Sequence, residues 1–209
     1  MKIGLNIGAG IGQSNNLFSD FDIIHCFEPQ LFSFNQLKSL DQSNLILHNY
    51  GISDINGYKT FTNYFHIGYS SLLDLDKDSE FYKFLTTEQD IEFDKDTWKT
   101  EVEVKRLDNF IIENNIKHIS LIKIDTQGHD LNVVKSLGNY INIVDTIMLE
   151  CQLKNLYKNS FTKDEVITYM EKNNFTLTNV KNNYNLPTDK IPSDGINWEE
   201  NLTFKNEKI

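Results

Sequence analysis

Short apolar runs that end at glycine or at an acidic residue recur along this chain. The first run covers residues 2–7 and leads directly into a glycine-rich turn, residues 8–12. A second run, residues 23–27, ends at Glu28. We interpret the two runs as buried strands, joined by the turn and by a short helix over residues 13–18. Strand, glycine turn, helix and strand in this order are typical of open α/β sheets that bind nucleotide-like cofactors.

The rest of the chain continues this alternation. Further strands are predicted over residues 45–49, 58–64, 100–104, 119–124, 144–149, 175–180 and 201–204, and helices over residues 29–40, 107–114, 130–137 and 162–173. Residues 119–124 are apolar on both faces except for Lys123, as expected for a central parallel strand. Asn56-Gly57 is a strong turn signal and predicts a hairpin that leads into residues 58–64.

Residues 66–98 interrupt the pattern: residues 68–72 are loop-like, and residues 74–96 are acidic with scattered aromatic side chains. We interpret them as an insertion with a short helix that covers the site as a lid. The alternative is a solvated excursion with a small core of its own. The length of 209 residues otherwise fits a single domain, residues 1–209, with helices on both faces of the sheet.

Charge and composition limit the expected partners. The formal net charge is −10, and the one basic stretch, residues 99–106, is interrupted by Glu101 and Glu103. Nucleic acid is therefore not expected as a partner, and a neutral hydroxylated molecule such as a sugar fits better. Apolar runs stay well below ~20 residues, so no membrane span is predicted. Without a signal peptide or a metal-type spacing of Cys26 and Cys151, we expect a cytoplasmic protein without a metal site.

The glycine-rich turn and Glu28 form a candidate cofactor site. Glycine allows a ligand to approach the backbone closely, and the first N–H groups of a following helix point toward that ligand. Glu28 lies about 20 residues after Gly8, where a carboxylate accepts hydrogen bonds from a ribose diol, and Pro29 ends the strand there. Because Gln13 replaces the third glycine of the dinucleotide pattern, S-adenosylmethionine fits the turn better than a nicotinamide dinucleotide.

Several stretches together resemble one known family. They are residues 6–12, 27–32, 49–57, 70–72, 106–110, 121–130, 133–135, 147–150 and 201–204. In this order they resemble the FkbM family of S-adenosylmethionine-dependent methyltransferases. The resemblance implies a Rossmann-like class I methyltransferase fold: a mostly parallel seven-stranded sheet with helices on both faces and an antiparallel last strand. It also implies O-methylation of a hydroxyl on a sugar, glycan or related small molecule.

The resemblance implies roles for individual residues as well. The expected cofactor-binding residues are Asn6, Gly8, Gly10, Gly12, Glu28, Pro29, Asn49 and Asp125. Among them the glycines hold the methionine end of S-adenosylmethionine, Glu28 holds the ribose hydroxyls and Asn49 faces the adenine. Gln127 and Glu150 are expected to contact the methyl acceptor.

Methyl transfer to a hydroxyl also requires a base. The protein mainly positions the reacting groups and removes the hydroxyl proton. Glu28, Asp125 and Glu150 each follow a predicted strand, so parallel topology places them around one crevice. Asp125 and His129, four positions apart at a strand-to-helix turn, are the candidate bases, since a histidine that titrates near ~6.5 suits the role.

Two other classes of function stay open at this point. A nicotinamide-dependent oxidoreductase would share the first two strands and Glu28, but Gln13 and the motif around Asp125 count against it. A cofactor-binding protein of the same fold that transfers nothing is compatible with Asn6, where the FkbM family often has aspartate.

Overall fold

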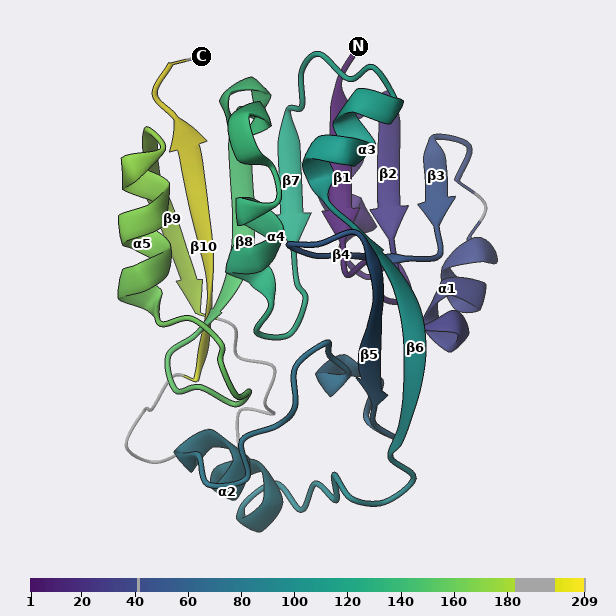
Figure 1. The fold of residues 1–209 in the computed structure, drawn as a ribbon, viewed down its shortest axis with the longest axis vertical. Coiled ribbons are helices and arrows are strands. Elements are labelled where there is room, and N and C mark those ends of the chain that lie inside the picture. Colours follow the sequence, from purple (N-terminus) through teal and green to yellow (C-terminus); the bar gives the residue numbers. More distant parts are fainter. Residues whose placement is uncertain (41, 183–197, 209) are drawn as a thin grey trace.

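The centre of the molecule is a seven-stranded sheet with the order β3-β2-β1-β7-β8-β10-β9 (Figure 1). This computed structural model describes residues 1–40, 42–182 and 198–208. The strands are β1 (Ile3–Ile7), β2 (Ile23–Phe27), β3 (Leu45–His48), β7 (Leu121–Ile124), β8 (Thr146–Gln152), β9 (Phe175–Asn182) and β10 (Glu199–Asn206). Strand β10 is antiparallel to β8 and β9, whereas β1, β2, β3, β7 and β8 pair in parallel. The predicted sheet with an antiparallel last strand is therefore confirmed.

The register of β1 explains why the predicted motifs meet at one edge. Ile7, the last residue of β1, lies opposite Phe27 of β2 on one side and Ile124 of β7 on the other. The chain therefore leaves all three strands at the same level, at Gly8, Glu28 and Asp125. Burial of the apolar side chains of β1 on both faces stabilises this alignment.

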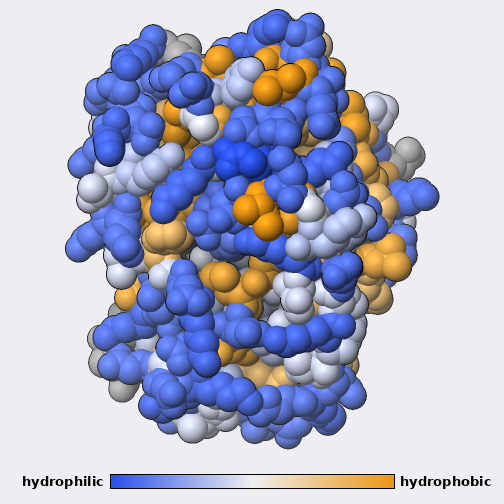
Figure 2. Space-filling model, in the orientation of Figure 1, coloured by the Kyte–Doolittle hydropathy of each residue, from blue (hydrophilic) through white to orange (hydrophobic). Residues whose placement is uncertain are grey.

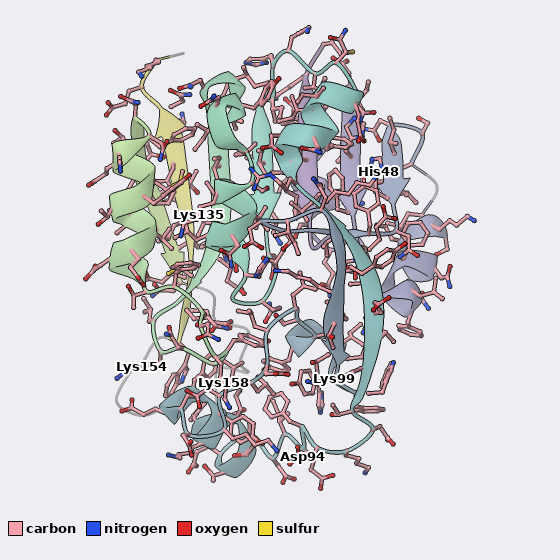
Figure 3. All side chains as sticks on the ribbon, viewed as in Figure 1. His48, Asp94, Lys99, Lys135, Lys154 and Lys158 are labelled. Atoms are coloured by element: carbon pink, nitrogen blue, oxygen red, sulfur yellow. The ribbon has the colours of Figure 1, made fainter. Side chains whose placement is uncertain are left out.

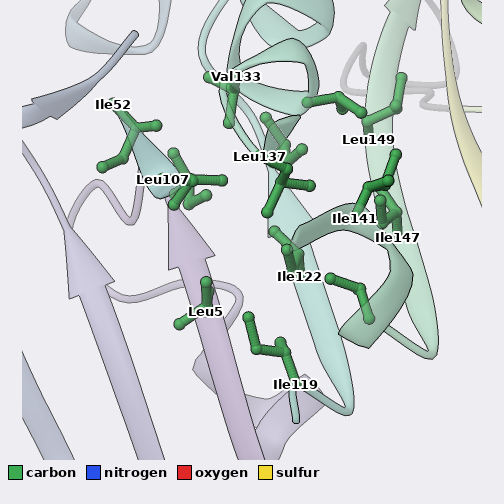
Figure 4. Close-up of a cluster of buried hydrophobic side chains, with 14 of the residues drawn as sticks. Leu5, Ile52, Leu107, Ile119, Ile122, Val133, Leu137, Ile141, Ile147 and Leu149 are labelled. Carbon is green, nitrogen blue, oxygen red and sulfur yellow. The ribbon is translucent and has the colours of Figure 1, made fainter. Parts of the chain in front are cut away.

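Helices cover both faces of the sheet, as predicted. The helices α3 (Leu107–Glu113), α4 (Asp130–Lys135), η3 (Gly138–Ile143) and α5 (Lys163–Lys172) lie on one face, and η1 (Asn15–Phe18) and α1 (Leu31–Lys38) on the other. Leu5, Ile122 and Leu137 belong to the larger core between the first face and the sheet (Figure 4). Thr162 and Glu165 form a capping box at the start of α5, the helix predicted over residues 162–173.

The first predicted helix is shorter than expected. Residues 13–18 were expected to be helical, but only the 3₁₀ turn η1 forms, beginning at Asn15 without a side-chain cap. So short a segment cannot offset the cost of starting an α-helix. The glycine turn is consequently not followed by an α-helix whose free N–H groups face a ligand.

A second sheet lies beyond the carboxyl edge of the first. It contains β4 (Gly51–Ile52), β6 (Trp98–Lys105) and β5 (Gly57–Asn63), in the order β4-β6-β5. The predicted hairpin at Asn56-Gly57 is wrong, because β5 pairs with the distant β6 rather than with the strand before the turn. The side-chain oxygen of Asn56 accepts a hydrogen bond from the N–H of Arg106 (2.9 Å), which directs the turn toward the end of β6.

The inserted segment, residues 66–98, has a core of its own. It contains η2 (Ile67–Tyr69) and α2 (Glu80–Thr87), and it lies below the main sheet in Figure 1. A cluster of buried side chains joins it to the rest of the chain: Tyr64, Leu75, Phe81, Leu85, Phe93, Leu156, Tyr157 and Trp198. Surface ion pairs of Lys154 with Glu80 and of Lys99 with Asp74 add to this attachment (Figure 3). Its action as a lid stays a prediction.

The surface is largely polar over the face drawn in Figure 2, with small separate apolar patches. In the described part of the chain, no helix is long and apolar enough to cross a membrane.

Candidate active site

A cavity of about 370 Å³ lies at the carboxyl edge of the main sheet. It is lined by the glycine turn, the segment after β2, the loop after β7, η2 of the insertion and the ends of β8 and β10. Seven of the predicted site residues line it: Gly8, Gly10, Glu28, Pro29, Asp125, Gln127 and Glu150. The other four, Asn6, Gly12, Asn49 and His129, do not.

The glycine turn is shaped by two different requirements. Gly8 has a φ of +71°, and a Cβ there would lie 1.8 Å from the carbonyl oxygen of Asp125. Gly10 also has a positive φ, +55°, but a Cβ there would meet no described atom within 4 Å. Gly8 therefore lets β1 pack against the loop after β7, whereas Gly10 leaves the space above the turn open to a ligand.

Glu28 is held at the cavity wall by two backbone donors. Its Oε2 accepts a hydrogen bond from the N–H of Gly10, and its Oε1 accepts one from the N–H of Gln30, both at 2.8 Å. Burial raises the pKa of Glu28 to about 7, and the charge of Asp125 acts in the same direction. The side chain is thus positioned in advance and changes its charge near neutral pH.

A network of polar side chains surrounds Asp125 in the cavity wall. Lys123 Nζ donates to Asp125 Oδ2 (2.8 Å), and Gln127 Nε2 donates to Asp125 Oδ1 (2.8 Å) and to Glu150 Oε2 (3.0 Å). Burial acts to raise the pKa of Asp125, but the charge and hydrogen bond of Lys123 hold it below its usual value. Burial and the charge of Asp125 raise the pKa of Glu150 well above its usual value. Asp125 is therefore the more acidic member of this pair.

The sequence analysis missed Glu199, which also lines the cavity. Burial, followed by the charge of Asp125, raises the pKa of Glu199 to about 7. The signal was available in the predicted antiparallel direction of the last strand. Such a strand begins at the edge where the parallel strands end, so its first residue, Glu199, lies opposite Gln152 near the end of β8, and its charge acts on Glu150.

Lys123 was noted in the sequence but given no role. Its side chain is only 7% exposed, and its ion pair with Asp125 lies within the cavity wall. A charged residue inside an otherwise apolar central strand is the sequence signal for such a partner, because buried charges require pairing.

His129 lies away from the cavity, although it follows Asp125 by only four residues. Its Nε2 is 3.0 Å from Ser53 Oγ, its Nδ1 is 3.1 Å from Asn132 Nδ2, and the side chain is buried. Burial and the nearby charge of Lys59 lower its pKa to about 4, so the ring is neutral at pH 7. This placement gives His129 a structural role between the end of β4 and α4, and it does not support His129 as the base.

Three other predicted cofactor residues lie outside the cavity wall and contact the segments that form it. Asn6 is buried beneath the glycine turn and donates to Asn15 Oδ1 (3.0 Å). Asn49 donates to the backbone carbonyl oxygen of Glu28 (2.9 Å) and so holds the chain next to the carboxylate. At Gly12, a Cβ would lie 2.4 Å from Leu40 Cδ1, so this glycine permits close packing beside α1.

Two solved structures share the fold over nearly the whole chain. The FkbM methyltransferase from Methylobacillus flagellatus KT has 14% identity and a TM-score of 0.54, over 97% of this chain and 43% of that protein. A protein from Listeria monocytogenes, assigned as an S-adenosylmethionine-dependent methyltransferase, has 7% identity and a TM-score of 0.54, over 99% of this chain and 91% of that one. This chain thus spans less than half the length of the Methylobacillus protein. The fold is the predicted class I methyltransferase fold.

A family comparison carries more weight than these structural likenesses, whose sequence identities are low. No curated protein sequence matches the chain. Residues 6–177, well over half of the chain, match the family model of the methyltransferase FkbM domain. The chain therefore belongs to the FkbM methyltransferase family.

Proposed function

We propose that this protein is an S-adenosylmethionine-dependent O-methyltransferase that acts on a hydroxyl of a sugar, a glycan or a related small molecule. The observation that supports this best is the cavity, which joins the glycine turn and Glu28 to the carboxyl pair of Asp125 and Glu150. Membership of the methyltransferase family makes S-adenosylmethionine the cofactor. The acidic chain, with a net charge of −10, favours an uncharged acceptor over nucleic acid.

The residues at the turn fit this cofactor. The space above Gly10 admits its methionine portion, next to Gly8. Each carboxylate oxygen of Glu28 accepts one backbone hydrogen bond and keeps further acceptor capacity for a ribose hydroxyl. Pro29 lies beside Glu28 in the cavity wall, where its ring offers an apolar surface.

The residues that follow β7 and lie on β8 fit the acceptor. S-adenosylmethionine supplies a methyl group already activated by a positively charged sulfur. With that cofactor bound, the methyl group would leave the sulfur, releasing S-adenosylhomocysteine, and would join the acceptor oxygen. Asp125 would take the proton of the acceptor hydroxyl, and Lys123 keeps Asp125 ionised beforehand. Gln127 and Glu150 are placed to hold neighbouring hydroxyls of the acceptor. Glu199, with a pKa of about 7, is a second proton acceptor in the cavity wall.

The test is methyl transfer from radiolabelled S-adenosylmethionine to a panel of free sugars, glycans, RNA and peptides. We expect label in a carbohydrate fraction, suppressed by excess S-adenosylhomocysteine, and none in RNA or peptide. Label in RNA or peptide instead would contradict the proposed acceptor class. Thermal stabilisation by S-adenosylmethionine without transfer to any acceptor would favour a non-catalytic binding protein, and stabilisation by NAD or NADP alone would favour an oxidoreductase.

Cofactor affinity should depend on pH through Glu28. Its pKa is about 7 in the ligand-free protein, so the carboxylate that accepts ribose hydroxyls is mostly protonated at pH 6 and mostly ionised at pH 8. We expect S-adenosylmethionine to bind about tenfold more tightly at pH 8 than at pH 6, as measured by titration calorimetry. Glu28→Gln should bind weakly at both values, whereas Glu199→Gln should keep the dependence. An equal pH dependence in Glu28→Gln and the unmodified protein would remove Glu28 from this role.

A further inference from the structure

We propose that Tyr157 is a positioning residue of this methyl transfer, because its hydroxyl holds the Gln127 side chain against Asp125 and Glu150. The inference rests on the proposed function, in which Asp125 and Gln127 contact the acceptor. Tyr157 lies between β8 and α5, outside every motif that the sequence analysis singled out. It does not line the cavity, so its effect on the reaction passes through Gln127.

The hydroxyl of Tyr157 joins two parts of the cavity wall. It lies 3.1 Å from Gln127 Oε1 and 2.7 Å from the backbone carbonyl oxygen of Tyr69. Tyr69 ends the 3₁₀ turn η2 of the insertion, and Gln127 belongs to the loop after β7. Tyr157 is 1% exposed, so its hydroxyl has little access to water. One buried hydroxyl thus connects the insertion to the loop that carries Asp125.

The backbone next to Gln127 also packs against the ring of Tyr157. Gln127 has a φ of +54°, a left-handed conformation that non-glycine residues rarely adopt, and Gly128 follows with a φ of +88°. A Cβ at Gly128 would lie 2.9 Å from Tyr157 Cδ2, so the ring and this backbone are in close contact. The hydroxyl of Ser71 donates to the carbonyl oxygen of Gln127 (2.8 Å). A strained conformation held from several sides in this way is typical of residues that must keep one geometry.

The hydrogen-bonding capacity of the amide explains why the hydroxyl matters. Asp125 is ionised and can only accept, so the NH₂ group of Gln127 must face it. The amide oxygen then points to the opposite side, where it shares the single hydroxyl proton of Tyr157 with the carbonyl oxygen of Tyr69. Without that donor the partly buried oxygen loses a hydrogen bond, so one of the restraints that keep the NH₂ group between Asp125 and Glu150 is removed.

If the Gln127 side-chain amide is held less firmly, the pKa of Asp125 should change. The charged and titratable groups that act on Asp125 or respond to its charge are Lys123, Glu28, Asp130, Glu150 and Glu199. The Lys123 ion pair stays in place when the Tyr157 hydroxyl is removed, whereas the hydrogen bond from Gln127 weakens. The pKa of Asp125 should therefore rise.

The experiment compares the full chain with Tyr157→Phe, Gln127→Met and the double variant by NMR, without any methyl acceptor. In Tyr157→Phe we expect hydrogen exchange of the Gln127 side-chain NH₂ to be about tenfold faster and the pKa of the Asp125 carboxyl to be higher. In the Gln127→Met background, removing the hydroxyl should no longer change the Asp125 pKa. Tyr64→Phe is the matched control, since Tyr64 is buried in the same cluster and none of its described contacts is with Gln127.

These readouts separate the inference from the proposed function, because they hold whether or not a sugar is methylated. Equal NH₂ exchange and equal Asp125 pKa in Tyr157→Phe and Tyr64→Phe would overturn it, since Tyr157 would then be an ordinary core residue. The inference is equally wrong if removing the hydroxyl still shifts the Asp125 pKa in the Gln127→Met background. If Tyr157→Phe does not fold, Gln127→Met alone decides: an unchanged Asp125 pKa would refute the coupling.

Discussion

Gly8→Ala should cost the protein about 4 kcal/mol or more of unfolding free energy, the largest stability effect expected for a single methyl group here. The added Cβ would lie 1.8 Å from the carbonyl oxygen of Asp125. The position of a Cβ is fixed by the backbone, and the carbonyl oxygen is itself part of the backbone. No side-chain rotation therefore relieves the overlap, and β1 or the loop after β7 must move. The positive φ of Gly8, +71°, adds strain for any other residue. Urea unfolding followed by circular dichroism measures the loss.

Gly10→Ala is the matched control for this prediction. Its φ is also positive, +55°, but its Cβ would point into open space in the cavity wall. We expect a stability loss of about 1 kcal/mol from backbone strain, together with weaker binding of S-adenosylmethionine because the methyl group occupies cofactor space. Equal stability losses at Gly8 and Gly10 would show that the close approach of the turn to Asp125 is not what requires glycine.

Asp125→Asn should abolish most turnover. Removing a general base typically lowers the rate about 10²- to 10⁴-fold, and asparagine cannot take the proton. The change also leaves the ammonium group of Lys123, whose side chain is 7% exposed, without its anionic partner. Such a loss typically costs about 3–5 kcal/mol of stability. The measurements are single-turnover methyl transfer to the acceptor found in the labelling assay and the urea midpoint of the folded variant.

The control for Asp125→Asn is a nearby acid that lies outside the cavity. Asp130 is buried, accepts hydrogen bonds from the N–H groups of Thr126 and Gly128, and has a pKa raised to about 6, chiefly by burial. Asp130→Asn keeps an acceptor oxygen and should retain turnover within about tenfold of the unmodified protein. If Asp125→Asn and Asp130→Asn lose activity equally, the loss reflects the shape of the loop rather than a base at Asp125.

The sequence predicted the parts of the site whose geometry depends on neighbouring residues. The glycine turn follows a strand, and Glu28 and Asp125 each end one, because strand periodicity and chain breaks are local properties. Parallel pairing then places the three strand ends at one edge, whatever the remaining chain does. For the same reason the capping box of α5, formed by Thr162 and Glu165, was predictable from four consecutive residues.

Only the tertiary structure decided which of these residues share the cavity. His129 and Gln127 are two positions apart, yet His129 turns to Ser53 while Gln127, in a left-handed conformation, faces Asp125. The pairing of β5 with β6, and of β10, which begins at Glu199, with β8, joins segments far apart in the sequence. Local periodicity thus determined strands, turns and strand-end acids, whereas side-chain burial and pairing over long distances decided their partners, since both depend on contacts that no short stretch of sequence contains.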